Sequence, residues 1–248
     1  MDSLKLRIAP KTPEPVEELP TGMVWIERGT QRAALFTPDE IEPGRRYPLL
    51  AVLHGAGRRE ELLMKAYRGE AQRRQALFLV PRSYHMTWDL IVAATQGAAA
   101  TSADGSPSAR PDLDFLEYAY DLIFRRYPVD SGRLGLVGYS DGASYALSVG
   151  LSNPHLFRAV MGWAAGFVAI ENEAAAPGVP RPAVLVEYGT HDELFPFEQV
   201  AVPMREQLEA FGCNVTFRVD QGGRHWPSSE FQEEALDWFF SEPRQPRS

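Results

Sequence analysis

The chain has 248 residues, of which 44 % are hydrophobic and 23 % are charged, values typical of a soluble globular protein with a packed core. Its 25 Lys and Arg against 33 Asp and Glu give a formal net charge of −8, which argues against a nucleic-acid-binding protein. No apolar run approaches the ~18 residues of a membrane span, and residues 1–10 do not resemble a secretory signal, so we expect a cytoplasmic protein. The single cysteine, Cys213, excludes an intrachain disulfide, and we interpret it as a small core residue.

Prolines and acids mark residues 1–22 as an extended N-terminal arm, and residues 23–248 are predicted to form one domain. Short apolar runs alternate with amphipathic helical patterns along this domain. The predicted strands are residues 23–27, 32–36, 49–53, 76–80, 133–137, 157–162, 184–188 and 215–219. The predicted helices are residues 59–74, a helix that starts at Pro111, and residues 141–152, 198–211 and 229–240, while residues 93–110 are predicted to be a loop. Strands that are apolar on both faces indicate an α/β fold with a mostly parallel sheet covered by helices on both sides.

The strongest local motif is the pentapeptide Gly-Tyr-Ser-Asp-Gly at residues 138–142, which follows a predicted strand and precedes a predicted helix. It fits the pattern G-x-S-x-G, in which a tight turn exposes a serine hydroxyl above the end of the sheet. As a bare pattern it is weak, because it recurs by chance, but the flanking strand and helix strengthen it. We therefore take Ser140 as the candidate nucleophile, with a purely structural turn as the alternative.

A serine hydroxyl needs a general base, and the base needs an acid that orients it. In this strand–turn–helix context the expected chain order is serine, acid, histidine. Asp192 follows the predicted strand 184–188, and His225 lies in a glycine-rich loop after the last predicted strand. Glu193 and Asp220 are the alternatives for the acid. The other histidines, which we weigh as structural, are His54, His85, His155 and His191.

Acyl transfer also needs hydrogen-bond donors for the oxyanion. One is expected from the backbone N–H of Asp141, the residue after the nucleophile. The other is expected from the small-residue loop at residues 54–57, with the N–H of Ala56 first and that of Gly57 second. An ordinary strand-to-helix turn is the alternative for this loop.

These segments together resemble the predicted-esterase branch of the α/β hydrolases, the phospholipase/carboxylesterase family with the related dienelactone-hydrolase-like and polyhydroxybutyrate-depolymerase-like esterases. The matching stretches are Leu-His-Gly-Ala-Gly at 53–57, the serine pentapeptide, Gly-Thr-His-Asp at 189–192 and Gly-Arg-His-Trp at 223–226. The resemblance runs from about residue 23 to 240 and implies the α/β-hydrolase fold and carboxylesterase activity without a cofactor or metal. Two departures stand out: dienelactone hydrolases have a cysteine where this chain has Ser140, and phospholipase/carboxylesterase members usually have glutamine where it has Asp141.

The segment between Trp163 and Arg181 is too short for a large cap domain, so a lightly covered site is expected unless residues 93–110 fold over it. This favours a small-molecule ester with a short to medium acyl chain as substrate. Thioester or amide cleavage, acyl transfer, and an inactive binding protein on the same fold are the alternatives, and the oligomeric state is open, with a homodimer among the alternatives. The side chains expected to line the substrate pocket are those of His54, Trp88, Tyr139, Trp163, Phe167, Phe195 and Trp226.

Overall fold

The computed structural model describes residues 4–14, 18–96, 100–101, 107–108, 110–170 and 180–241 of the chain. Its main strands are β1 (Met23–Arg28), β2 (Gln31–Phe36), β3 (Tyr47–Leu53), β4 (Leu77–Pro81), β7 (Val129–Tyr139), β8 (Ala159–Trp163), β9 (Ala183–Gly189) and β10 (Val215–Asp220). The helices are α1 (Glu60–Tyr67), α2 (Glu70–Arg74), α3 (Asp89–Gln96), α4 (Pro111–Arg126), α5 (Asp141–Ser152), α6 (Phe197–Ala210) and α7 (Ser229–Ser241). A two-residue pair, β5 (Ala100–Thr101) and β6 (Pro107–Ser108), forms a separate small hairpin.

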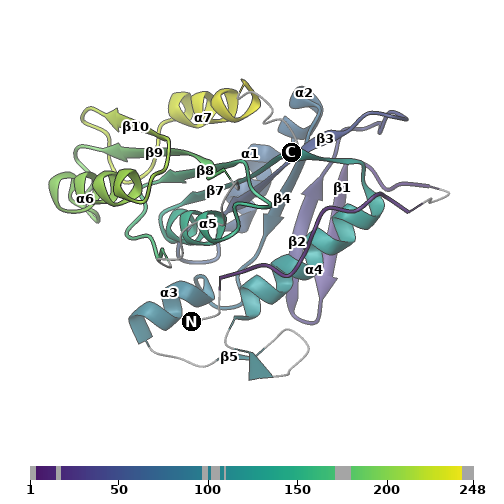
Figure 1. Cartoon of the computed structure of the whole chain (residues 1–248), viewed down its shortest axis with the longest axis horizontal. Coiled ribbons are helices and arrows are strands. Elements are labelled where there is room, and N and C mark those ends of the chain that lie inside the picture. Colours follow the sequence, from purple (N-terminus) through teal and green to yellow (C-terminus); the bar gives the residue numbers. More distant parts are fainter. Residues whose placement is uncertain are drawn as a thin grey trace.

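The main sheet has eight strands in the order β1-β2-β4-β3-β7-β8-β9-β10 (Figure 1). The first two pairings, β1 with β2 and β2 with β4, are antiparallel, and every later pairing is parallel. This confirms the predicted mostly parallel α/β sheet. Because the parallel strands all end at one edge, the loops after β3, β7, β9 and β10 meet there.

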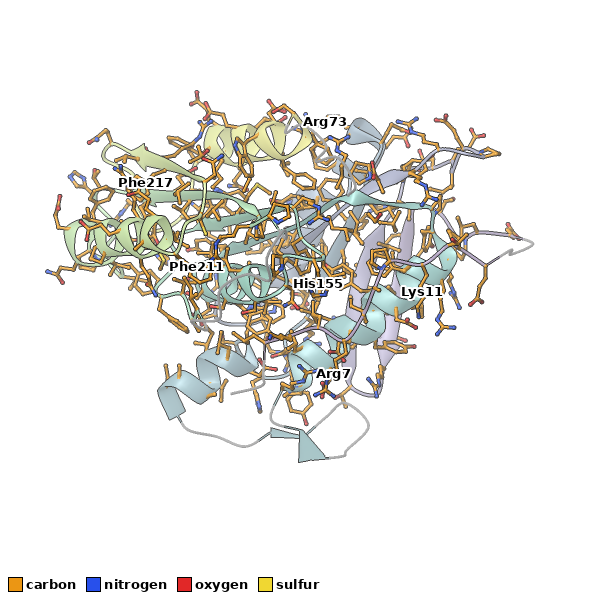
Figure 2. The ribbon with its side chains drawn as sticks, viewed as in Figure 1. Arg7, Lys11, Arg73, His155, Phe211 and Phe217 are labelled. Atoms are coloured by element: carbon orange, nitrogen blue, oxygen red, sulfur yellow. The ribbon has the colours of Figure 1, made fainter. Side chains whose placement is uncertain are left out.

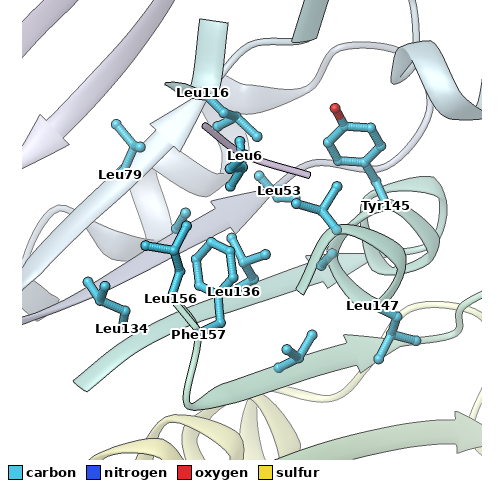
Figure 3. Packing of buried hydrophobic residues seen from close by; sticks show 14 of the residues in the cluster. Leu6, Leu53, Leu79, Leu116, Leu134, Leu136, Tyr145, Leu147, Leu156 and Phe157 are labelled. Atoms are coloured by element: carbon cyan, nitrogen blue, oxygen red, sulfur yellow. The ribbon is translucent and has the colours of Figure 1, made fainter. Parts of the chain in front are cut away.

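Burial on both faces of the sheet explains why the central strands are apolar at nearly every position. In β3, the side chains of Leu49, Ala51 and Leu53 enter one buried cluster, while Leu50 and Val52 enter the other. The first cluster is covered by α4, α5 and α6, and the second by α1, α2 and α7. Figure 3 shows the packing within the first cluster, with Leu136 of β7 beside Phe157.

Three predicted elements differ from the structure. The helix expected at residues 59–74 is divided into α1 and α2, because a bend at Arg68 and Gly69 separates them. Residues 89–96, of which 93–96 belonged to the predicted loop, form α3, whose first residue Asp89 is a buried acid. β7 begins directly after Pro128 at Val129 and is irregular where it first pairs with β3. Half of the expected 93–110 loop, and residues 171–179, lie outside the described residues.

The described part of the N-terminal segment is extended, but it is more than a surface arm. Leu4 and Leu6 are buried among the core residues, and Figure 3 shows Leu6 beside Leu53 and Leu116. The buried Asn153 side chain, directly after α5, donates to the backbone oxygen of Leu4 and accepts from the N–H of Leu6, both at 2.7 Å. Further along, Lys11 pairs with Asp121 of α4, and Figure 2 shows Lys11 beside this helix. The segment is therefore fastened across α4 and the end of α5.

Candidate active site

The candidate nucleophile lies on a sharp turn between β7 and α5. Ser140 has φ 53° and ψ −119°, a conformation that is uncommon and strained for any residue other than glycine. The turn is held on both sides, because the Ser140 N–H donates to the Trp163 carbonyl of β8 at 2.8 Å and its own carbonyl accepts from the N–H of Ala143 at 2.9 Å. The neighbouring strand and helix thus hold the serine in a strained geometry in which its hydroxyl meets the ring of His225.

The two glycines of the pentapeptide are required by close backbone contacts. A Cβ atom at Gly138 would lie 2.0 Å from the carbonyl oxygen of Gly142. A Cβ atom at Gly142 would lie 2.4 Å from the backbone oxygens of Leu53 and His54, at the end of β3. No L side chain fits at these distances, so the turn and the approach of α5 to β3 both depend on glycine.

The structure brings the three candidate catalytic residues into one hydrogen-bonded chain. His225 Nε2 lies 2.9 Å from Ser140 Oγ, and His225 Nδ1 lies 2.8 Å from Asp192 Oδ2. Ser140, Asp192 and His225 come from the loops after β7, β9 and β10, and all three are less than 9 % exposed. These distances match a nucleophile, a general base and an orienting acid.

The Asp192 carboxylate is anchored as well as paired. Its Oδ1 accepts the backbone N–H groups of Leu194 and Phe195 at 2.8 and 2.9 Å, which leaves Oδ2 directed at His225. These hydrogen bonds fix the orientation of the carboxylate relative to the ring of His225. The side chain can therefore hold the imidazole in the tautomer that places its bare Nε2 toward the serine hydroxyl.

The alternative acids are not in position to orient His225. Glu193 is exposed and its carboxylate lies 3.6 Å from the Arg224 guanidinium. Asp220 is the last residue of β10, and its side chain packs against the backbone of Gly223. Among the remaining histidines, His155 and His191 are exposed, and His155 follows the C-terminal end of α5, whereas Ser140 precedes the N-terminal end of this helix.

The loop after β3 faces the nucleophile turn. Within the described part of the chain, the N–H groups of Ala56 and Asp141 have no protein acceptor, as oxyanion donors require. The N–H of Gly57 donates to the carbonyl of Met86 at 2.8 Å, so this second-choice donor is already engaged. Ala56 is exposed while its neighbour Gly55 is buried against the Tyr139 ring. The geometry therefore favours Ala56 and Asp141 as the pair of donors.

The predicted pocket residues separate into two groups. Tyr139, Phe195 and Trp226 surround the candidate base: the rings of Tyr139 and Phe195 lie 5.3 and 5.2 Å from that of His225, and Trp226 meets Tyr139 at 4.1 Å. Trp226 is 49 % exposed, so part of this aromatic wall is open to solvent. Phe167 is half-buried on the segment after β8.

His54, Trp88 and Trp163 were also expected to line the pocket, but each of these side chains is at most 3 % exposed. His54 stacks on Trp88 at 4.7 Å, and its Nδ1 bonds to the Gly55 carbonyl at 2.7 Å while Nε2 accepts the N–H of Ser83 at 3.1 Å. Burial lowers the pKa of His54, which keeps the ring neutral. Aromatic side chains such as these suit both a pocket wall and the protein interior, and the sequence alone does not distinguish the two.

Two polar residues near the site were missed by sequence reasoning. Thr87 donates its hydroxyl to the Asp141 carboxylate at 2.6 Å. Glu187, in β9, is buried beside a cavity of about 10 Å³ that His225 and Trp163 also line. Burial raises the pKa of Glu187 to about 8, and the nearby Asp220 carboxylate adds to this shift. The sequence did contain a signal for Glu187, because this glutamate interrupts an otherwise apolar predicted strand.

The single cysteine, Cys213, is partly buried and lies outside the candidate triad. Burial raises the pKa of the Cys213 thiol to about 11, so this cysteine is unsuited to nucleophilic chemistry. Among the described residues, no group of three or more His, Cys, Asp or Glu side chains could hold a metal ion. Within the same residues, no helix is long and apolar enough to cross a membrane.

Comparison with known proteins gives matches to solved structures only. An S-formylglutathione hydrolase from Agrobacterium tumefaciens has a TM-score of 0.64 at 15 % identity, over 90 % of this chain and 96 % of that chain. A CE1 ferulic acid esterase from Anaeromyces mucronatus has a TM-score of 0.63 at 16 % identity, over 96 % of this chain and 98 % of that chain. The chain has the α/β-hydrolase fold.

A third hydrolase-fold structure, a putative dienelactone hydrolase from Klebsiella pneumoniae, has a TM-score of 0.62 at 17 % identity, over 89 % of this chain and 99 % of that chain. No protein-family model matches the chain, and no curated protein matches it. Identities this low establish the shared fold, so the argument for function depends on the site itself.

Proposed function

We propose that the protein is a serine carboxylic ester hydrolase that acts on short- to medium-chain esters through Ser140, His225 and Asp192. The observation that carries this proposal is the continuous hydrogen-bonded chain from Ser140 Oγ through the His225 ring to the Asp192 carboxylate, at 2.9 and 2.8 Å. The esterases and hydrolases among the structural neighbours support the same class of reaction. Every proton transfer in this scheme is assigned to a side chain, so the proposed reaction needs no cofactor.

In the first half of the reaction, Ser140 Oγ attacks the ester carbonyl while His225 Nε2 takes the hydroxyl proton. The tetrahedral oxyanion accepts hydrogen bonds from the backbone N–H groups of Ala56 and Asp141. When the intermediate collapses, the C–O bond to the alcohol breaks and His225 gives its proton to the departing alcohol. Asp192 stays ionised and stabilises the imidazolium that exists between the two transfers.

In the second half, water hydrolyses the acyl-enzyme: water is now the nucleophile, and Ser140 is the leaving group. His225 takes a proton from the water as it attacks the acyl carbonyl, and the same two N–H groups hold the second oxyanion. When this intermediate collapses, the bond between the acyl carbon and Ser140 Oγ breaks, the proton on His225 returns to Oγ, and the carboxylic acid leaves. Thioester and amide substrates use the same triad chemistry, and the carboxylic ester is our choice because of the resemblance of the motifs to esterases.

The decisive experiment measures the hydrolysis of p-nitrophenyl acetate, butyrate and octanoate by the wild type and by Ser140→Ala. We expect turnover by the wild type, faster for the shorter chains, and a loss of at least about 10³-fold in the variant. Ser152→Ala on the same helix is the matched control, because among the described residues the Ser152 hydroxyl donates to the Ser148 carbonyl of α5 and does not reach the triad candidates. An inert wild type, or a variant as active as the wild type, would overturn the proposal and favour an inactive binding protein on this fold.

A further inference from the structure

The segment of residues 83–88, between β4 and α3, touches the loop that carries the proposed first oxyanion donor. The Ser83 N–H donates to His54 Nε2 at 3.1 Å, and the Trp88 indole N–H donates to the His54 carbonyl at 2.8 Å. The Met86 carbonyl accepts the N–H of Gly57 at 2.8 Å. Three hydrogen bonds thus hold the loop on both sides of Ala56, and we call residues 83–88 the brace.

The brace also reaches the turn that carries the proposed second donor. Thr87 Oγ1 donates to Asp141 Oδ2 at 2.6 Å, a short hydrogen bond typical of a hydroxyl that meets a charged carboxylate. Asp141 directly follows Ser140 and begins α5. One six-residue segment therefore contacts the two chain segments, 85 positions apart, whose N–H groups would have to converge on one oxygen atom.

The brace is itself held in place by a hydrogen bond to a buried residue at the start of α4, which is bonded in turn to the start of α3. The Tyr84 N–H donates to Asp112 Oδ1 at 2.6 Å, at the start of α4. Asp112 and Asp89 also exchange backbone-to-carboxylate hydrogen bonds, each of 2.8 Å, which ties the starts of α3 and α4 together. Both acids are buried, so the brace rests on the protein interior and is not a free surface loop.

We infer that Thr87 is a positioning residue for oxyanion stabilisation, acting through the Asp141 carboxylate; this rests on the proposed function. Oxyanion donors work only when they lie about 2.7–3.1 Å from the oxygen in the transition state, so the spacing between Ala56 and Asp141 matters. The hydroxyl of Thr87 sets that spacing from the Asp141 side. It also holds the negative carboxylate in a hydrogen bond, where free rotation would let it approach and repel the developing oxyanion.

The test replaces Thr87 with valine, which keeps the branched shape and removes the donor, and with serine, which restores the donor. With the active-site concentration measured by titration, we expect Thr87→Val to lower kcat/KM for p-nitrophenyl acetate about 10- to 100-fold and to leave KM within about 2-fold. Thr87→Ser should recover to within about 3-fold of the wild type. The matched control is Thr95→Val on α3, because within the described residues the Thr95 hydroxyl donates to the Ile91 carbonyl of its own helix, at 2.7 Å.

A second readout separates positioning from a merely structural role. Inhibition by a boronic acid, which forms a tetrahedral anionic adduct on the nucleophile, should weaken in Thr87→Val by the same factor as kcat/KM. If Thr87→Val does not fold, Thr87→Ala replaces it in both measurements. The inference is overturned if the variant keeps kcat/KM and boronate affinity within about 2-fold of the Thr95→Val control. In that outcome the wild type is active and Ser140→Ala is not, whereas failure of the proposed function would show as an inert wild type or an active Ser140→Ala.

Discussion

Replacing Glu187 by glutamine should stabilise the protein relative to the wild type, and this difference should grow as the pH rises. The reason is that ionisation of the buried Glu187 carboxyl destabilises the wild type. The Glu187 side chain is only 3 % exposed, and within the described residues its Oε2 has no hydrogen-bond partner. The charges of Asp220 and Arg218, both in β10, act on its pKa, and Arg224 and His225 line the same cavity. Glutamine has the same shape and cannot ionise.

The magnitude follows from the two pKa values of Glu187. In the folded protein its pKa is about 8, against an ordinary value of 4.5 in the unfolded chain. The folded state therefore binds the proton more tightly, so the stabilisation is complete below pH 4.5 and is lost as the pH rises toward 8. One pKa unit corresponds to about 1.4 kcal/mol, so the wild type should lose roughly 3 kcal/mol of unfolding free energy from this group between pH 5 and pH 8.

The assay is urea unfolding of the wild type and Glu187→Gln at pH 5, 6, 7 and 8. We expect the difference in unfolding free energy, variant minus wild type, to grow by about 3 kcal/mol across this series. Glu27→Gln is the matched control, because Glu27 is an exposed strand residue at the edge of the sheet and its difference should stay flat. A Glu187→Gln difference that changes by less than about 1 kcal/mol would refute the reasoning.

Three further predictions follow from other contacts. Gly142→Ala should abolish activity, because the added Cβ atom would meet the backbone at the end of β3. Its free energy of unfolding, measured with urea, should fall by about 3 kcal/mol, whereas Gly69→Ala, which adds a Cβ atom in open space, should be nearly neutral. Trp226→Ala should lower kcat/KM for benzyl acetate about 5- to 10-fold more than for ethyl acetate, whereas the remote exposed Trp25→Ala should leave this ratio unchanged. Asn153→Ala should lower the free energy of unfolding by about 2–4 kcal/mol, because the Leu6 N–H and the Leu4 carbonyl lose their hydrogen-bond partner. A loss below about 1 kcal/mol would contradict this.

Local patterns in the sequence were enough to predict the sheet and the candidate triad. The central strands are apolar on both faces, and such runs are recognisable without any knowledge of their partners. Ser140, Asp192 and His225 each lie in the loop that follows a predicted strand, and the carboxyl ends of parallel strands must meet at one edge. Their convergence therefore follows from topology, although the hydrogen-bond distances do not.

The features that were missed depend on contacts between distant segments. Nothing local distinguishes Thr87 from other loop threonines, because its role arises from Asp141, 54 residues later. Likewise, the burial of Trp88 and the exposure of Trp226 follow from packing, since both are tryptophans adjacent to site motifs. The break between α1 and α2 is a further example, because the basic and acidic residues around it suit one continuous helix equally well.

At Ser140, the backbone conformation that the proposed reaction needs lowers the stability of the fold. A non-glycine residue in such a conformation costs of order 1–3 kcal/mol, and the contacts from β8 and α5 maintain it. A glycine at this position would relieve the strain and remove the hydroxyl at the same time. A lineage released from selection for catalysis could thus gain stability by a single substitution, so persistence of the serine in homologues would itself be evidence of selection for the reaction.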